Sequence, residues 1–299
     1  MKTPVAFIIF NRPDTTKQVF EAIRQAKPPK LLVVADGPRV DRPGEAEKCA
    51  AARAIIDGVD WECEVLINYS DINLGCKLRV SSGLDWVFSE VEEAIILEDD
   101  CLPHPSFFPF CEELLNYYRN DQRIMAIGGC NFQFGNNRND YSYYFSHHSH
   151  IWGWASWRRA WQNYDVDMKL WKEVRDCDLL KSVLNDNKSL KYWNKIFQDT
   201  YNGLIDTWDY QLTFTLWSQN GLTILSNSNL VSNIGFREDA THTKGNSKVA
   251  NMPTEAIDFP LKHPPFMMRN IQADEYTEKV FFNSSLLNRI KMKIISIFK

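Results

Sequence analysis

The sequence has no excess of positive charge and no sign of disorder. Its 299 residues include 34 Lys and Arg against 38 Asp and Glu, for a formal net charge of -4. A protein that binds a nucleic acid duplex usually presents a basic face, so we expect no nucleic-acid partner. With 44% hydrophobic residues and only 13 Gly and 13 Pro, the composition is that of a folded globular chain.

Cysteines are few and unpaired in sequence. The seven of them are spread from position 49 to 177 without a C-x-x-C pair. This pattern argues against a disulfide framework and against a structural zinc site. It fits a reducing, cytoplasmic setting, which we therefore predict for the protein.

Long apolar runs are also missing. No stretch of eighteen apolar residues occurs, so no transmembrane helix is expected. The apolar run 5–10 is too short for a signal peptide, and Asn11, Arg12 and Asp14 follow it at once. We interpret it as a buried first strand.

The first 130 residues alternate short apolar runs with amphipathic stretches. This pattern predicts an α/β fold with a parallel sheet covered on both faces. Strands are expected at 5–10, 31–35, 65–68, 94–97 and 124–127, and helices at 15–27 (capped by Asp14), 43–57, 75–90 and 106–118. Ligands bind beyond the carboxyl ends of such strands, where this chain carries Asn11-Arg12, Asp36-Gly37 and Glu98-Asp99-Asp100.

The second half is rich in aromatic residues. Strands are expected at 141–145 and 222–225, and helices at 189–201 and 208–219. No linker separates the halves, so we predict a single domain over 1–284 with lobes at about 1–130 and 131–250. The segment 285–299 predicts a separate basic amphipathic helix.

Three consecutive acids, Glu98, Asp99 and Asp100, end the fourth predicted strand. A hard divalent cation relieves the repulsion among such carboxylates and can be shared with a diphosphate. Asp100, the furthest out, is the best metal ligand. Glu98 and Asp99 suit ribose hydroxyls or the waters of the metal. The alternative is a solvated acidic turn.

Here the sequence resembles the GT-A glycosyltransferases. More narrowly, it is similar to the inverting N-acetylglucosaminyltransferase I type and to bacterial family 2-like glycosyltransferases. The resemblance covers about residues 4–245 and rests on four segments, which are Asn11-Arg12-Pro13, Val34–Gly37, Asn73–Gly75 with Lys77 and Arg79, and Leu97–Phe108.

The resemblance implies a GT-A fold, with a mixed, mostly parallel sheet flanked by helices. It also implies a nucleotide-sugar donor, most simply a UDP-sugar, with Mn²⁺ or Mg²⁺ as cofactor. The 1–130 lobe would bind the nucleotide and the 131–250 lobe the acceptor. Asn11, Arg12 and Asp36 would contact the donor. Lys77 and Arg79 would face its diphosphate or, alternatively, lie on a solvated helix face.

Two aromatic segments carry further expectations from the resemblance. Trp152, Gly153 and Trp154 would form part of the donor pocket, because sugar faces pack on aromatic rings. Trp208 would bind the donor beside Asp209, the catalytic base of an inverting transfer. The alternatives are an aromatic core cluster and, for Asp209, an acid that caps a helix or lies in its first turn. Asp206 is the substitute base.

The resemblance also implies that a polar loop after the last strand closes over the donor. In it, Arg237 would meet the diphosphate and His242 the metal. The alternative is that both are simply exposed.

The segment 285–299 carries four basic residues and no acidic one, with apolar residues at helical spacing. It therefore predicts peripheral attachment to an anionic membrane surface, on its inner face. A glycan or lipid-linked acceptor for surface polysaccharide follows from that placement. The alternative is a last helix packed on the core.

Two other functions stay open. A nucleotidyltransferase uses the same type of sheet, but usually carries a glycine-rich loop after the first strand, where this chain has Phe10-Asn11-Arg12-Pro13. A non-catalytic sugar-binding relative is the second alternative. The acids at 98–100 and 209 count against it.

Overall fold

The computed structural model describes residues 1–236 and 249–282. The predictions for Arg237, His242 and the helix at 285–299 fall outside these ranges. Within them, no helix has the length and apolarity needed to cross a membrane. All seven cysteines are free thiols.

Eight strands form one mixed, mostly parallel sheet. Its spatial order is β3-β2-β1-β4-β8-β6-β9-β7. The strands are β1 (Val5–Ile9), β2 (Lys30–Ala35), β3 (Glu64–Tyr69), β4 (Glu93–Glu98), β6 (Ile124–Gly128), β7 (Tyr143–Ser146), β8 (Trp154–Trp157) and β9 (Leu222–Ser226). β8 and β7 run antiparallel to their neighbours. A second, two-stranded sheet pairs β5 (Cys101–Pro103) with β10 (Val231–Asn233).

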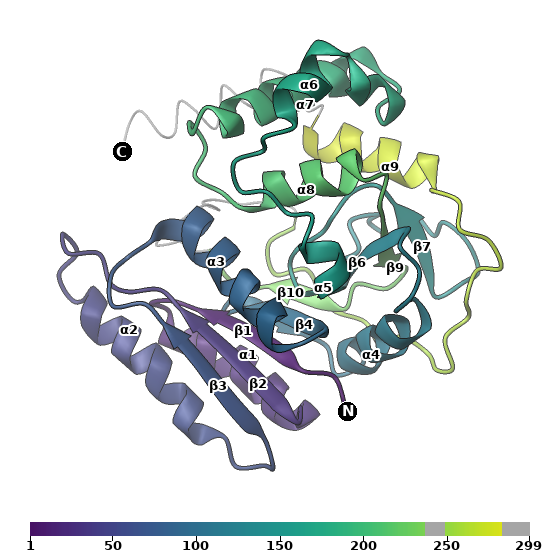
Figure 1. Cartoon of the computed structure of the whole chain (residues 1–299). Coiled ribbons are helices and arrows are strands. Elements are labelled where there is room, and N and C mark those ends of the chain that lie inside the picture. Colours follow the sequence, from purple (N-terminus) through teal and green to yellow (C-terminus); the bar gives the residue numbers. More distant parts are fainter. Residues whose placement is uncertain (237–248, 283–299) are drawn as a thin grey trace.

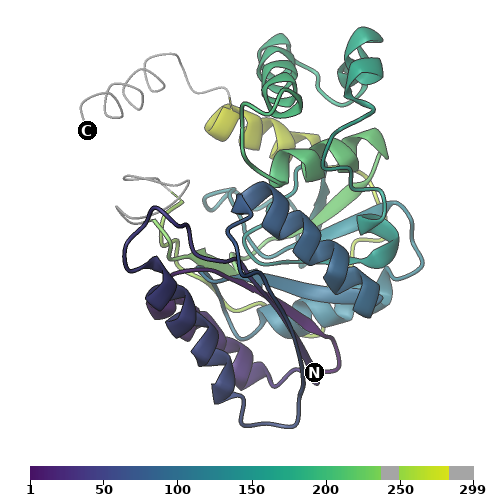
Figure 2. The ribbon, with the colours of Figure 1, turned by 60° about the vertical axis from the view of Figure 1, so that its left-hand side comes forward.

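Helices cover both faces of the large sheet, as Figures 1 and 2 show. They are α1 (Pro13–Ala26), α2 (Glu45–Ala54), α3 (Gly75–Glu90), α4 (Phe107–Tyr117), α5 (Arg158–Trp161), α6 (Trp171–Asp176), α7 (Asn187–Tyr201), α8 (Asp209–Ser218) and α9 (Ile271–Thr277). Two 3₁₀ helices, η1 (Ile55–Gly58) and η2 (Leu179–Ser182), and a π-helix, η3 (Glu278–Phe282), complete the elements of the described ranges.

The side chains of β1 alternate between the two faces of the sheet, which explains why helices cover both faces. Val5, Phe7 and Ile9 pack with α1 and α4 in one core. Ala6 and Ile8 face the opposite way and pack with α3, α7 and α8 in a second core. Successive side chains of a strand point to opposite faces, so an unbroken apolar strand requires a cover on each side. The predicted α/β class, with a mostly parallel sheet flanked by helices, is confirmed.

Three local predictions need correction. Asp14 does not cap α1, because the cap position is Arg12 and Asp14 lies in the first turn. The helix expected at 43–57 is the shorter α2 followed by η1. The segment around Trp154 contains strand β8, which inserts between β4 and β6 and which the sequence pattern did not predict.

Candidate active site

A cavity of about 280 Å³ opens at the carboxyl ends of β1, β2 and β4. These strands run parallel, with Val5 of β1 aligned to Leu31 of β2 and to Ile95 of β4, so their ends meet at one edge. The cavity is lined by Ile8, Ile9, Phe10, Arg12, Asp36, Arg39, Asn73, Gly75, Cys76, Arg79, Val80, Glu98, Asp99 and Asp206. Five of the predicted site residues therefore lie together: Arg12, Asp36, Arg79, Glu98 and Asp99.

Arg12 joins the acidic triplet directly. Its Nη2 lies 3.0 Å from Asp99 Oδ1, and its Nη1 lies 2.7 Å from Asp100 Oδ2. The backbone N–H of Phe10 donates to Asp99 Oδ2 at 3.1 Å. The triplet is thus a partly buried charge cluster built from the ends of β1 and β4, rather than a solvated acidic turn.

The single positive charge of Arg12 does not neutralise the three carboxylates of Glu98, Asp99 and Asp100. Burial, with the charges of Asp100 and Asp99, raises the pKa of Glu98 to about 8. Burial also raises the pKa of Asp99 to about 7, although Arg12 opposes the shift. Among the described residues, the Glu98 carboxylate has no hydrogen-bond or ion-pair partner. The site therefore favours additional positive charge.

These carboxylates suit Mg²⁺ or Mn²⁺ by donor chemistry, since both prefer hard oxygen ligands. Gly235 packs so closely against Asp100 that a Cβ there would lie 2.1 Å from Asp100 Oδ2. A second candidate metal site lies elsewhere in the described ranges. It consists of His147, His148 and Glu278, whose possible ligand atoms all lie within 4.8 Å of one another. His242, the other predicted metal ligand, is outside those ranges.

Asp36 holds a turn at the start of α3. Its Oδ1 accepts hydrogen bonds from the backbone N–H groups of Gly37 and Leu74, both at 2.9 Å. Its Oδ2 accepts from Gly75 N at 3.1 Å and from Asn73 Nδ2 at 3.0 Å. With four donors on two oxygens, Asp36 fixes the cavity wall formed by the Asn73–Gly75 turn, and has little capacity left for a nucleotide base.

Arg79 and Lys77 differ although both lie in α3. Arg79 is buried, and its Nε donates to Ala35 O at 3.1 Å while its Nη2 donates to Asn68 Oδ1 at 2.8 Å. The solvated-face alternative is therefore wrong for Arg79, which binds the ends of β2 and β3. Lys77 is half-buried in the first turn and does not line the cavity.

Arg39 belongs to the site and is held there by Glu45, and the sequence predicted neither residue. Arg39 lines the cavity, and its backbone N–H donates to Glu45 Oε2 at 2.7 Å. Asn11 Nδ2 donates to Glu45 Oε1 at 2.8 Å, so Asn11 ties the loop after β1 to α2 rather than facing the cavity. The Arg39 side chain pairs with Glu45, and these hydrogen bonds lower the pKa of Glu45. No spacing signal links positions 39 and 45 to the triplet.

The two candidate bases lie on either side of the start of α8. Asp206 is exposed and lines the cavity, 3.3 Å from a Cβ placed on Gly75. Asp209 is the first residue of α8, so its first-turn position is confirmed, while the cap position is Trp208. Asp209 accepts a hydrogen bond from the Thr207 hydroxyl. Its negative charge also contributes to the raised pKa of Glu98, which places it near the triplet.

The tryptophans divide into core and surface. Trp154 and Trp208 are each 2% exposed, and their rings stack with centroids 5.8 Å apart. Both are core residues of the face covered by α3 and α8. Gly153 has φ +66°, and a Cβ there would meet Val231 at 2.6 Å, so packing alone explains this glycine. Trp152 is partly exposed and contacts Phe236 edge to face.

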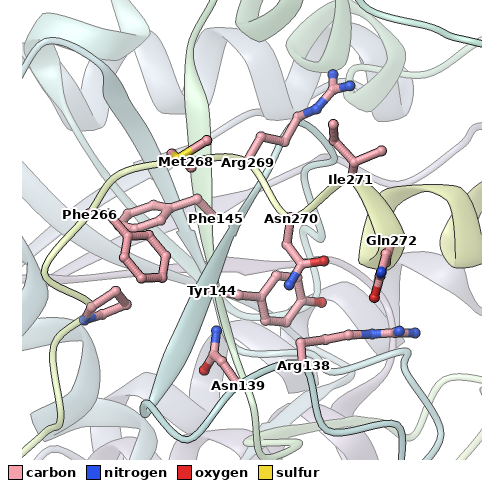
Figure 3. Close-up of a pocket in the computed structure, with 11 residues that line it drawn as sticks. Arg138, Asn139, Tyr144, Phe145, Phe266, Met268, Arg269, Asn270, Ile271 and Gln272 are labelled. Atoms are coloured by element: carbon pink, nitrogen blue, oxygen red, sulfur yellow. The ribbon is translucent and has the colours of Figure 1, made fainter.

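A second cavity, of about 310 Å³, lies at the far edge of the sheet, beside β7. Figure 3 shows its lining, where Tyr144, Asn139 and Asn270 lie near one another and Arg269 extends away from them. It shares no residue with the cavity at the ends of β1, β2 and β4, which we call the acidic cavity.

No family model matches the chain, and no curated protein matches it. Solved structures do. A 4-diphosphocytidyl-2C-methyl-D-erythritol synthase from Anaerococcus prevotii is 9% identical, covers 75% of this chain and 88% of its own, and has a TM-score of 0.38. A UDP-glucose pyrophosphorylase complexed with UDP-glucose is 10% identical, with coverage of 76% and 90% and a TM-score of 0.35. Mouse xyloside xylosyltransferase 1 is 11% identical, with coverage of 72% and 82% and a TM-score of 0.33. At these values the likenesses carry no argument about activity.

Proposed function

We propose that the protein is a metal-dependent glycosyltransferase with a GT-A type sheet. It transfers a sugar from a nucleotide-sugar, most simply a UDP-sugar, to a hydroxyl of a glycan or lipid-linked acceptor, with inversion. The observation that carries the proposal is the cavity at the ends of β1, β2 and β4, with the acidic triplet, Arg12 and Asp206 around it.

The charges of the cavity suit a donor with a diphosphate. Arg12 and Arg39 supply positive charge, and Asp100 would hold Mn²⁺ or Mg²⁺, with Glu98 and Asp99 placed for ribose hydroxyls or for the waters of the metal. When bound, the metal would neutralise the diphosphate leaving group. Arg12 keeps Asp99 and Asp100 in place by its two ion pairs. Asp36 keeps the Asn73–Gly75 wall in place, by the hydrogen bonds described above.

The acceptor proton needs a carboxylate on the far side of the sugar. We assign this role to Asp209, with Asp206 as the alternative, because both acids flank the start of α8. In an inverting transfer the base removes the proton of the acceptor hydroxyl as it attacks the anomeric carbon. The hydrogen bond from Thr207 orients the Asp209 carboxylate.

A donor screen tests the proposal. Purified protein is heated with a panel of nucleotide-sugars, with and without Mn²⁺, because a bound ligand raises the melting temperature. Donor turnover is then measured by the nucleotide released. A glycosyltransferase releases a nucleoside diphosphate, whereas a nucleotidyltransferase acting in reverse with pyrophosphate releases a nucleoside triphosphate. No binding and no turnover with any donor would leave the non-catalytic sugar-binding alternative.

The membrane proposal is separate and concerns residues 285–299. We propose that this basic segment attaches the enzyme to an anionic membrane surface, where a lipid-linked acceptor for surface polysaccharide would be met. The test is co-sedimentation with anionic liposomes, for the full chain and for a chain ending at Asn283. Equal binding of both forms would contradict the membrane role and leave the transferase proposal untouched.

A further inference from the structure

Two histidines and a glutamate meet outside the acidic cavity. His147 and His148 follow β7, and Glu278 begins η3, directly after α9. Their ligand atoms all lie within 4.8 Å of one another, and the three residues are buried. His147 Nε2 is 2.9 Å from His148 Nε2, which is 3.1 Å from Glu278 Oε1. In Figure 1, α9 lies near α8, at the end of the molecule away from β3.

The protons of the two imidazoles do not fit these contacts. Arg269 Nη1 is a donor 2.7 Å from His147 Nδ1, which places the His147 proton on Nε2. That proton points at His148 Nε2, whose lone pair then faces Glu278 Oε1. If His148 Nε2 carries the proton instead, the His147 proton sits on Nδ1 and faces Arg269. With neutral imidazoles, one contact therefore always joins two acceptors or two donors. In the first arrangement these are His148 Nε2 and Glu278 Oε1, and in the second they are His147 Nδ1 and Arg269 Nη1.

The surroundings are apolar, which makes an uncompensated carboxylate costly. The ring of His148 lies among Trp193, Trp217 and Phe282, with centroids 5.6 to 6.2 Å away. Glu278 Oε1 accepts from Trp193 Nε1 at 2.9 Å. Glu278 Oε2 is buried and has no hydrogen-bond partner among the described residues. The cluster thus contains a buried carboxylate oxygen that no described residue uses.

A cavity of about 240 Å³ reaches the cluster. His147, Arg269, Asp274 and Glu278 line it, so small ions can arrive from this side. Asp274 is also the residue best placed to support a metal ligand. Its Oδ2 lies 3.8 Å from His147 Nδ1 and 3.4 Å from Arg269 Nε.

We propose that His147, His148 and Glu278 bind a structural Zn²⁺ ion. Two imidazole nitrogens and a carboxylate are a known zinc donor set, and Glu278 Oε2 would supply the fourth ligand that a closed structural site needs. Binding places the His147 proton on Nδ1, where it donates to Asp274 after a small shift, while Arg269 Nη1 leaves Nδ1 and Arg269 keeps its contact with the same carboxylate. Such a carboxylate behind a ligating histidine orients the ring and raises its basicity.

The site would fasten α9 and η3 to the β7 edge of the sheet. β7, α7 through Trp193, and η3 converge on it, so zinc would fix η3 against the aromatic core. The proposal is independent of the glycosyltransferase proposal, whose metal lies at the ends of β1 and β4. The cysteine pattern predicted that no structural zinc site is present, and this proposal departs from that prediction because its ligands are histidine and glutamate.

Zinc titration tests the site. The full chain is stripped with a chelator, dialysed and titrated with Zn²⁺ against a chromophoric chelator. We expect one Zn²⁺ per chain with a Kd below about 1 µM. Glu278→Gln retains the oxygen that accepts from Trp193, and it should weaken binding at least about 10-fold. Glu113→Gln is the matched control, because Glu113 Oε1 forms a similar pair with His263 Nε2 at 3.0 Å.

A second readout separates the two metal sites. Asp100→Asn should leave the zinc titration unchanged, and Co²⁺ in place of Zn²⁺ should give the visible absorption of a four-coordinate nitrogen and oxygen site. Absence of zinc binding in the wild type, or equal binding by Glu278→Gln, would overturn the proposal and leave a hydrogen-bond network with His148 donating to Glu278. If Glu278→Gln fails to fold, the wild-type titration and the cobalt spectrum decide.

Discussion

The two halves of the chain use their polar and aromatic residues in different ways. In the amino-terminal half, the acids and arginines that follow β1, β2 and β4 converge on one cavity. In the second half, Trp154 and Trp208, expected near a ligand, are core residues, while His147 and His148 form a buried polar cluster that no motif predicted.

Sheet geometry accounts for the difference. Parallel strands place their carboxyl ends at one edge, so polar residues after separate strands must meet there. An aromatic residue has no such constraint, since a tryptophan supplies core volume as readily as a surface for a sugar. Its sequence position therefore says less about function. If this contrast holds, substitutions at the acidic cavity should mainly reduce turnover, and substitutions of the buried tryptophans should mainly reduce stability.

Asp100→Asn should reduce sugar transfer by at least about 10³-fold, because metal stabilisation of the leaving group contributes several kcal/mol. The measurement is steady-state turnover at saturating Mn²⁺. Asp140→Asn, which changes an exposed acid elsewhere, is the control and should be fully active. Full activity of Asp100→Asn, or of the wild type in excess chelator, would show that the acidic cavity is not the metal site.

Asp209→Asn should leave donor binding unchanged and cut turnover by about 10² to 10⁴-fold, the usual contribution of a general base. Donor binding is followed by thermal shift and turnover by product release. Asp206→Asn is the comparison. If Asp206→Asn shows the larger loss, the roles of the two acids are reversed. Near-normal turnover with a lowered melting temperature would make Asp209 a structural first-turn acid.

Trp208→Ala should lower the free energy of unfolding by about 3 to 5 kcal/mol, because it leaves a cavity beside Trp154 in the core. Trp152→Ala, at a partly exposed ring, should cost clearly less. Urea unfolding measures both. A stable Trp208→Ala protein with weakened donor binding would show instead that the aromatic half shapes the ligand site.

Asp186→Ala should cost about 1 kcal/mol, because Asp186 caps α7 by accepting from Lys188 N and Ser189 N at 2.9 and 3.0 Å. Partial burial acts to raise the pKa of Asp186, but the hydrogen bonds from Ser189 and Lys188 outweigh it and lower the pKa. The cap therefore stabilises the protein above the unfolded pKa of about 3.9, and is lost as the pH falls through the lower folded pKa.

Unfolding of the wild type and of Asp186→Ala at pH 7 and near pH 3 checks this sign. The difference between the two proteins should shrink at the lower pH. A difference that grows on acidification would mean that Asp186 does not stabilise α7 as a charged cap.

Much of the first half followed from the sequence. The helix predicted at 75–90 is α3 with the same bounds, and the strand at 94–97 lies within β4. Periodicity suffices there because each strand is a continuous apolar run and each helix an amphipathic one. The meeting of Arg12 with the acidic triplet followed from the same rule of parallel strands.

Other features depended on contacts between distant segments. β8 was missed because Trp154–Trp157 has no strand alternation of its own, and is held by β4 on one side and β6 on the other. Arg39 lies at the cavity because it pairs with Glu45, and no sequence pattern predicts that pair. Asp36 was predicted as a nucleotide contact, but its oxygens are taken by backbone groups of a turn 38 residues further on.

By itself, then, the sequence determined the α/β class and the edge of the sheet at which charge gathers, since both depend on local periodicity and on parallel strand direction. Only the tertiary structure decided which tryptophans are buried, which acids already have partners, and that His147, His148 and Glu278 meet. Burial and hydrogen-bond partners come from residues far apart in the chain, and no local pattern records them.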